Sequence, residues 1–214
     1  DVSLDRPLEI QFATRLNGQP LNLEGTLGPL GNPPASQPLA FDLALAALEE
    51  LNVQLTGDAR DLQTQPAVNL SVNVAAFSPR QVFERLGRPF PLQTNDPETL
   101  KAVALQARLS GGMTGIKVED GQMQLDQSRI DFSAAVAEFD KPRIDFEARI
   151  DDLDIDRYRP AAAEPDTPAK TGEPSPSAAK KPDSPKAIDY GPLRRLVVDA
   201  RLKVDKLKVN QARL

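Results

Sequence analysis

The amino-acid sequence predicts a mainly β fold, in which an antiparallel sheet carries two short helices. Three observations support this prediction. Apolar and polar residues alternate along most of the 214 residues, which places them on opposite faces of strands. Short turns separate most alternating segments, as in antiparallel hairpins. Helix-start signals occur at two places only.

The first hairpin is predicted around Asn17-Gly18, a pair that tolerates the positive φ of a tight turn. Alternating apolar residues flank this pair over 8–16 and 21–27. The stretch 28–38 is rich in Gly and Pro, which is typical of a loop.

The next segment allows two interpretations. Residues 44–51 are strong helix formers, yet 39–45 alternates beforehand and 51–55 alternates again directly afterwards. We therefore predict two strands joined by a turn near Glu49-Glu50. Another alternating strand follows over 68–74.

Both predicted helices begin at a polar residue followed by Pro. Ser78 is a good N-cap and Pro79 suits the first helical position, so a helix is expected near 79–86, with Gly87 closing it. Asp96-Pro97 repeats this signal and predicts a short helix near 97–101.

Strands resume after the second helix. Asp120-Gly121 is a strong hairpin signal between two short apolar segments. The alternating segments run over 103–109, 116–118, 123–125, 130–136 and 144–150, the last continuing through Leu153 to Ile155.

The chain then changes character. We assign 1–159 to the β-rich domain and 160–187, which lacks large apolar residues, to a disordered Pro/Ala/Ser/Lys linker. Residues 188–214 are expected to complete or extend the sheet. Their alternation changes phase near Asp205-Lys206, which predicts a β-bulge or a turn there.

Composition argues against several function classes. The formal net charge is −5, and no basic cluster suited to nucleic acid is present. The chain has no Cys and no His, which removes thiol chemistry, Ser–His pairs and the commonest transition-metal ligand. No two carboxylates are marked as an acid/base pair. We predict a non-enzymatic protein without cofactor or metal.

Three alternating carboxylates resemble the start of a calcium loop. Asp152, Asp154 and Asp156 have the right spacing, but Arg157 and Ala163 stand where such a loop has Gly and Glu. We interpret the three Asp as the solvent face of a strand.

The aliphatic faces of the predicted strands need a cover or an occupant. A β-sandwich would pack two such faces together, whereas a trough would leave them lining an interior that acyl chains can fill. Alternation alone leaves both architectures open. The predicted lining residues are Ile10, Phe12, Leu43, Leu70, Val72, Leu105, Phe132, Ile144, Phe146 and Leu202.

Two stretches resemble the AsmA family of bacterial envelope proteins. Residues 77–109 carry Phe-Ser-Pro-Arg, a short helix ending in Leu-Gly, Asp-Pro-x-x-Leu and an Ala-Leu-x-Ala-x-Leu strand. Residues 146–158, FEARIDDLDIDRY, are similar to the family segment Asp-Leu-Asp-x-Asp-x-Tyr, which a low-complexity linker follows. Residues 123–136 also fit the family pattern of a short hairpin before a Phe-Ser strand. The resemblance covers most of the chain from Val68 onward.

This resemblance implies an architecture, a location and a role. It favours an antiparallel sheet curled into a groove or half-barrel over the β-sandwich. It implies a periplasmic segment of a protein anchored in the inner membrane by a helix outside this chain, acting in outer-membrane biogenesis and lipid transport. The expected partners are phospholipid acyl chains along a β-groove, with envelope proteins as further partners. The alternative function is a structural or assembly factor that influences outer-membrane protein insertion through protein contacts, without lipid.

Overall fold

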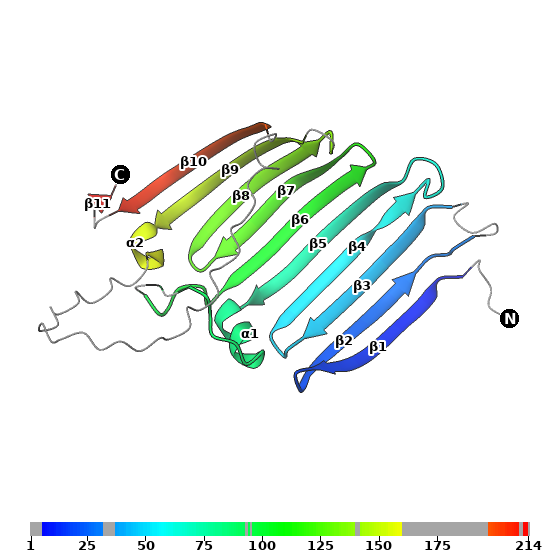
Figure 1. Ribbon diagram of the computed structural model, residues 1–214, viewed down its shortest axis with the longest axis horizontal. Coiled ribbons are helices and arrows are strands. Elements are labelled where there is room, and N and C mark those ends of the chain that lie inside the picture. The colour runs from blue at the N-terminus through cyan, green and yellow to red at the C-terminus, as the bar shows by residue number, and fades with distance from the viewer. Residues whose placement is uncertain are drawn as a thin grey trace, which may run out of the picture.

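The computed structural model describes residues 6–31, 37–92, 94, 96–139, 142–159, 197–209 and 212–213. They form one open sheet whose 11 strands follow each other in chain order (Figure 1). The predicted linker, 160–187, lies outside the described residues. The strands are β1 (Leu8–Leu16), β2 (Gln19–Leu27), β3 (Leu39–Ala47), β4 (Leu51–Arg60), β5 (Ala67–Phe77), β6 (Val103–Gly112), β7 (Gly115–Leu125), β8 (Ser128–Ala137), β9 (Arg143–Asp154), β10 (Val197–Val209) and β11 (Ala212–Arg213).

The mainly β prediction with two short helices is confirmed. The sandwich alternative is wrong for the part of the chain that the structure describes, because all of its strands belong to a single sheet. Alternation specifies which face of a strand is apolar, but a sandwich and a single sheet share that pattern.

Turn residues explain most hairpins. Asn17 and Gly18 have φ values of 51° and 81°, so the predicted tight turn between β1 and β2 is confirmed. The predicted strand–turn–strand arrangement over 39–55 is also confirmed. β3 ends at Ala47, and Leu48 and Glu49 take positive φ before β4 begins. Residues with high helix propensity in this stretch therefore form strands, because pairing with neighbouring strands outweighs their local preference.

The hairpin predicted at Asp120-Gly121 is wrong. β7 continues through both residues, and its register with β8 shifts between Val118 and Gly121, which marks a β-bulge. Asp120 does adopt the positive φ, 49°, that the turn signal implied. The same positive φ also occurs at a β-bulge, where the strand continues beyond the residue.

Helix α1 (Pro79–Arg85) forms as predicted. Ser78 is its N-cap and accepts a hydrogen bond from Gln81 N at 3.3 Å, and Pro79 opens the helix. The helix predicted at 97–101 is instead a turn over 97–100. In that turn, the Asp96 carboxylate accepts from Glu98 N at 2.8 Å.

The second helix lies elsewhere. α2 (Ile155–Tyr158) follows β9 directly, and the Asp154 side chain caps it by accepting from Asp156 N at 3.1 Å. The interpretation of 152–156 as one strand is therefore wrong beyond Asp154. The alternate Asp residues that suggested a strand face include a helix cap, for which Asp is equally suited.

The last long strand pairs differently from the others. β10 is parallel to β9, whereas every other pair in the sheet is antiparallel. The bulge or turn predicted near Asp205-Lys206 is absent from the register, since the offset between β10 and β9 is the same on both sides. Leu207 lies opposite Leu153, so both strands change the phase of their apolar residues at the same level.

One end of the sheet carries both helices (Figure 1). α1 reaches the β3–β4 turn through an ion pair of 2.6 Å between Arg85 and Glu49. α2 is tied to the turn over 97–100 by Arg157 Nε, which donates to the Asp96 carboxylate at 2.7 Å. We call α1, residues 96–102 and α2 the end cap.

Candidate functional site: the apolar face of the sheet

Strand pairing aligns apolar side chains in rows that cross the sheet. The central row passes through all ten strands from β1 to β10 and consists of large apolar residues throughout. Its members are Phe12, Leu23, Leu45, Val53, Val74, Leu105, Met123, Ile130, Ile150 and Val204. With strands about 4.8 Å apart, this row is roughly 43 Å long.

Three further rows lie beside the central row. The second comprises Ile10, Gly25, Leu43, Leu55, Val72 and Ala107, and resumes beyond the bulge at Gly121 with Phe132, Ala148 and Leu202. The third comprises Leu8, Leu27, Phe41, Gly57, Leu70, Leu109, Val118, Ala134, Phe146 and Ala200. The fourth comprises Leu39, Ala59, Val68, Gly111, Ile116, Val136, Ile144 and Val198. None of the four rows contains a charged or polar side chain, and together we call them the apolar face.

The register places all ten sequence-predicted lining residues on this face. Phe12 and Leu105 are in the central row, Leu70 and Phe146 in the third, and Ile144 in the fourth. The other five belong to the second row: Ile10, Leu43, Val72, Phe132 and Leu202. The prediction missed most of the central row, although the same alternation marks residues such as Ile130 and Ile150.

Nothing in the described part of the chain covers the apolar face. Extensive contacts between strands are made only by neighbours in the sheet. Phe12, Phe146 and Leu202 are 54%, 38% and 65% exposed. The buried apolar residues are few, and most are small: Ala47, Leu48, Ala59, Ala107, Ala148 and Ile150. The side chains of this face therefore pack on their same-face neighbours and remain open to an occupant.

Two glycines within the rows are covered by aromatic rings from a neighbouring strand. A Cβ at Gly121 would lie 2.6 Å from Phe132 Cζ, and one at Gly57 would lie 2.8 Å from Phe41 Cζ. Each ring thus occupies the space above a residue that has no side chain. The sequence signal for this arrangement is weak, because a lone Gly in a strand pattern predicts only a bulge or a close approach.

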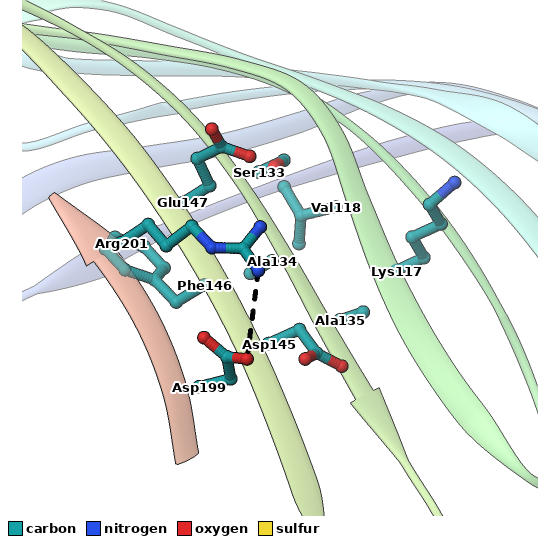
Figure 2. Close-up of a pocket in the computed structure, with 10 residues that line it drawn as sticks. All are labelled: Lys117, Val118, Ser133, Ala134, Ala135, Asp145, Phe146, Glu147, Asp199 and Arg201. Carbon is teal, nitrogen blue, oxygen red and sulfur yellow. Dashed lines mark ion pairs between the residues drawn. The ribbon is translucent and has the colours of Figure 1, made fainter. Parts of the chain in front are cut away.

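The opposite face of the sheet is charged. Figure 2 shows a shallow hollow whose lining includes the charged residues Lys117, Asp145, Glu147, Asp199 and Arg201. Arg201 and Asp199 form an ion pair at 3.9 Å. Among the described residues, no cluster of three or more His, Cys, Asp or Glu is arranged to hold a metal ion.

The end cap is held by one carboxylate. Asp126, in the β7–β8 turn, accepts hydrogen bonds from Leu100 N at 2.8 Å, Lys101 N at 2.9 Å and Ala102 N at 3.2 Å, and from the Tyr158 hydroxyl at 2.8 Å. Burial alone would raise the pKa of Asp126, but these bonds outweigh burial and hold it below its ordinary value. Burial and the bond to Asp126 raise the pKa of Tyr158 to about 12. The cap thus joins α2 to the β7–β8 turn at one end of the apolar face.

Comparison with models of known families, with curated proteins and with solved structures finds no significant match. No helix in the described residues is long and apolar enough to cross a bilayer.

Proposed function

We propose that the apolar face binds the acyl chains of phospholipid, along a groove formed by the sheet. The observation that carries this proposal is the central row, which is apolar in every strand from β1 to β10 and lies on an uncovered face. An acyl chain placed along the rows would meet no unpaired polar side chain. Each CH₂ removed from water would contribute about 0.8 kcal/mol, so one or two chains would bind without a head-group site.

The setting of this activity is part of the proposal. The AsmA-like motifs in 77–109 and 146–158 support a periplasmic segment of an inner-membrane-anchored protein that serves outer-membrane biogenesis. Their role in the fold is structural: the first stretch forms α1 and the turn over 97–100, and the second forms the end of β9 and α2. The protein would act by binding and guiding lipid, without catalysis.

Extraction of the purified chain, followed by mass spectrometry, tests this function. Phospholipid is expected to co-purify with the parent chain in a reproducible molar ratio. Ile130→Asn, which places a polar amide in the central row, should lower that ratio severalfold because an unsatisfied polar group next to an acyl chain is costly. Asp131→Asn, on the charged face of the same strand, is the matched control and should leave the ratio unchanged.

A chain that folds but carries no lipid under any extraction condition would contradict the proposal. It would favour the alternative function, in which the same face contacts envelope proteins.

A further inference from the structure

Six neighbouring strands, β4 to β9, have paired terminal residues at the end of the sheet farthest from the helices. The register joins the residues of this end directly across the sheet, in the order Arg60, Ala67, Gly112, Gly115, Ala137 and Arg143. The loops that connect these strands are 61–66, 113–114 and 138–142. Their described residues, 61–66, 113–114, 138–139 and 142, lie at the end of the sheet opposite α1 and α2 (Figure 1).

Each of these loops presents one large, exposed apolar side chain. Leu62 is 40% exposed, Met113 66% and Phe139 48%. Hairpin tips ordinarily carry Gly, Asn, Asp, Ser or Pro, because these residues suit the turn geometry and water. We call Leu62, Met113 and Phe139 the apolar rim.

Turns at the opposite end of the sheet lack this feature. The β1–β2 turn consists of Asn17 and Gly18, and the β7–β8 turn of Asp126 and Gln127. Leu48, in the β3–β4 turn, is apolar but only 4% exposed. Among the described hairpin turns, large exposed apolar side chains thus occur at the rim end, whereas Leu92, 56% exposed, lies in the longer connection between α1 and β6 at the other end.

The spacing of the rim suits a fluid surface better than a protein partner. Successive loops are two strands apart, or roughly 10 Å, so the three side chains form separate points. A specific protein interface needs a contiguous patch, whereas lipid packs around single inserted side chains.

Charges of both signs occur among the described residues near the rim. Arg60 is paired with Asp58 at 2.6 Å, and Lys117 with Glu119 at 2.5 Å. Asp61 and Glu138 stand beside the rim residues. Insertion would therefore depend on apolar burial and would not require anionic lipid.

We propose that the apolar rim inserts into the interfacial region of a lipid bilayer and thereby docks this end of the strands on a membrane. This inference goes beyond acyl-chain binding by the apolar face and stands on different residues. The fourth row of the apolar face lies one residue inside the row of strand ends, since Ala59, Val68 and Ile144 directly adjoin Arg60, Ala67 and Arg143. Docking would therefore bring the apolar face to the level at which acyl chains begin.

Single labelled cysteines test the insertion directly, because the chain has no Cys of its own. Leu62→Cys, Met113→Cys and Phe139→Cys would each carry an environment-sensitive fluorophore, and phosphatidylcholine vesicles would be added. All three labels should shift to the blue and brighten. Leu92→Cys is the matched control, because Leu92 is 56% exposed but lies between α1 and β6 at the opposite end; its label should not respond.

A triple variant tests the contribution of the rim to binding. Leu62→Ser, Met113→Ser and Phe139→Ser together should reduce sedimentation with the same vesicles by roughly tenfold or more. Leu92→Ser should bind as the parent does. Since all four side chains are exposed, circular dichroism and the melting temperature should stay unchanged, and the triple variant should still carry co-purified lipid.

Four results would overturn the inference. One is an equal response of the label at position 92. A second is a change in the fluorescence of the rim labels with protein concentration in the absence of vesicles, which would indicate contact between copies of the chain. A third is parent-like vesicle binding by the triple variant. The fourth is binding that requires phosphatidylglycerol. Loss of co-purified lipid by Ile130→Asn with vesicle binding intact would separate the two activities.

Discussion

At the scale of single residues, Asp126 joins three separate segments. Its carboxylate holds the backbone of 100–102, and Tyr158 of α2 adds a hydroxyl donor. Asp126 itself adopts a φ of 53°, which Asp tolerates better than most residues. One side chain thus satisfies backbone donors that precede β6 and fixes the position of α2.

Asp126→Asn is expected to destabilise the chain by about 1–3 kcal/mol at pH 7, because an amide offers one acceptor oxygen and no charge. The pKa of Asp126 is depressed in the folded state, so its contribution is present above its ordinary pKa of 3.8 and is lost as the pH falls through the lower, folded value. The difference in the free energy of unfolding between the parent chain and Asp126→Asn should therefore become smaller below pH 3.8. Urea unfolding at pH 7 and at pH 3 measures it.

The control for this prediction is Asp145→Asn. Asp145 is exposed on the charged face and lies opposite Asp199 in the register. Removing the charge of Asp145 should leave the free energy of unfolding unchanged at either pH, since like charges directly opposite each other do not stabilise a sheet. If Asp126→Asn lowers the free energy of unfolding equally at pH 7 and pH 3, the hydrogen-bonding geometry of the side chain matters there and its charge does not.

At the scale of elements, α1 is positioned by contacts at both of its ends. The Ser78 side chain caps it, and the Ser78 amide donates to Glu50 Oε1 at 3.1 Å, which ties the cap to the β3–β4 turn. Phe83 meets Phe90 edge to face, with ring centroids 5.4 Å apart. Arg80 lies over the same Phe90 ring at 4.8 Å from its centroid.

Ser78→Ala should cost about 1 kcal/mol through loss of the cap. Phe83→Ala should cost about 2 kcal/mol, which is less than for a fully buried Phe, because Phe83 is half-buried in the end cap. Thermal unfolding followed by circular dichroism measures both. Equal and negligible effects would show that α1 contributes no stability to the end of the sheet.

The elements also show how far sequence reasoning reaches. Local signals predicted the turn at Asn17-Gly18 and the cap at Ser78, because each depends on one or two neighbouring residues. Asp120-Gly121 misled because the conformation that makes a turn also makes a bulge, and pairing with β6 and β8 decides between them. The parallel pairing of β9 and β10 had no local signal, since it depends on the direction in which a distant segment returns.

At the scale of the whole molecule, the described chain is a single layer without a conventional core. Most members of the apolar face are half-buried by their neighbours in the sheet, and stability is expected to come from strand pairing and same-face contacts. The shared face of the ten sequence-predicted residues follows from alternation, because each belongs to an alternating strand. Their alignment into rows could not be predicted, since it depends on register across as many as ten strands.

A charge in the centre of the apolar face gives the sharpest test of how this layer is used. Leu105 lies in the central row between Val74 and Met123. A photoactivatable residue at Val74 should cross-link phospholipid in the parent chain. Leu105→Asp should abolish the adduct, because an unpaired carboxylate beside an acyl chain is costly. On an uncovered face the same Asp can reach water, so β-type circular dichroism should be retained.

The matched control is Gln106→Lys, one residue along the same strand. Gln106 is exposed on the charged face, where its amide donates to Asn73 Oδ1 at 3.3 Å. A lysine there stays in water, so the adduct at position 74 should persist. If Leu105→Asp instead unfolds the chain and the parent never forms a lipid adduct, the apolar face is covered by protein and the acyl-chain proposal fails. Retained folding with loss of the adduct in Leu105→Asp alone would support lipid on the central row, because Gln106→Lys adds a charge to the same strand on the opposite face.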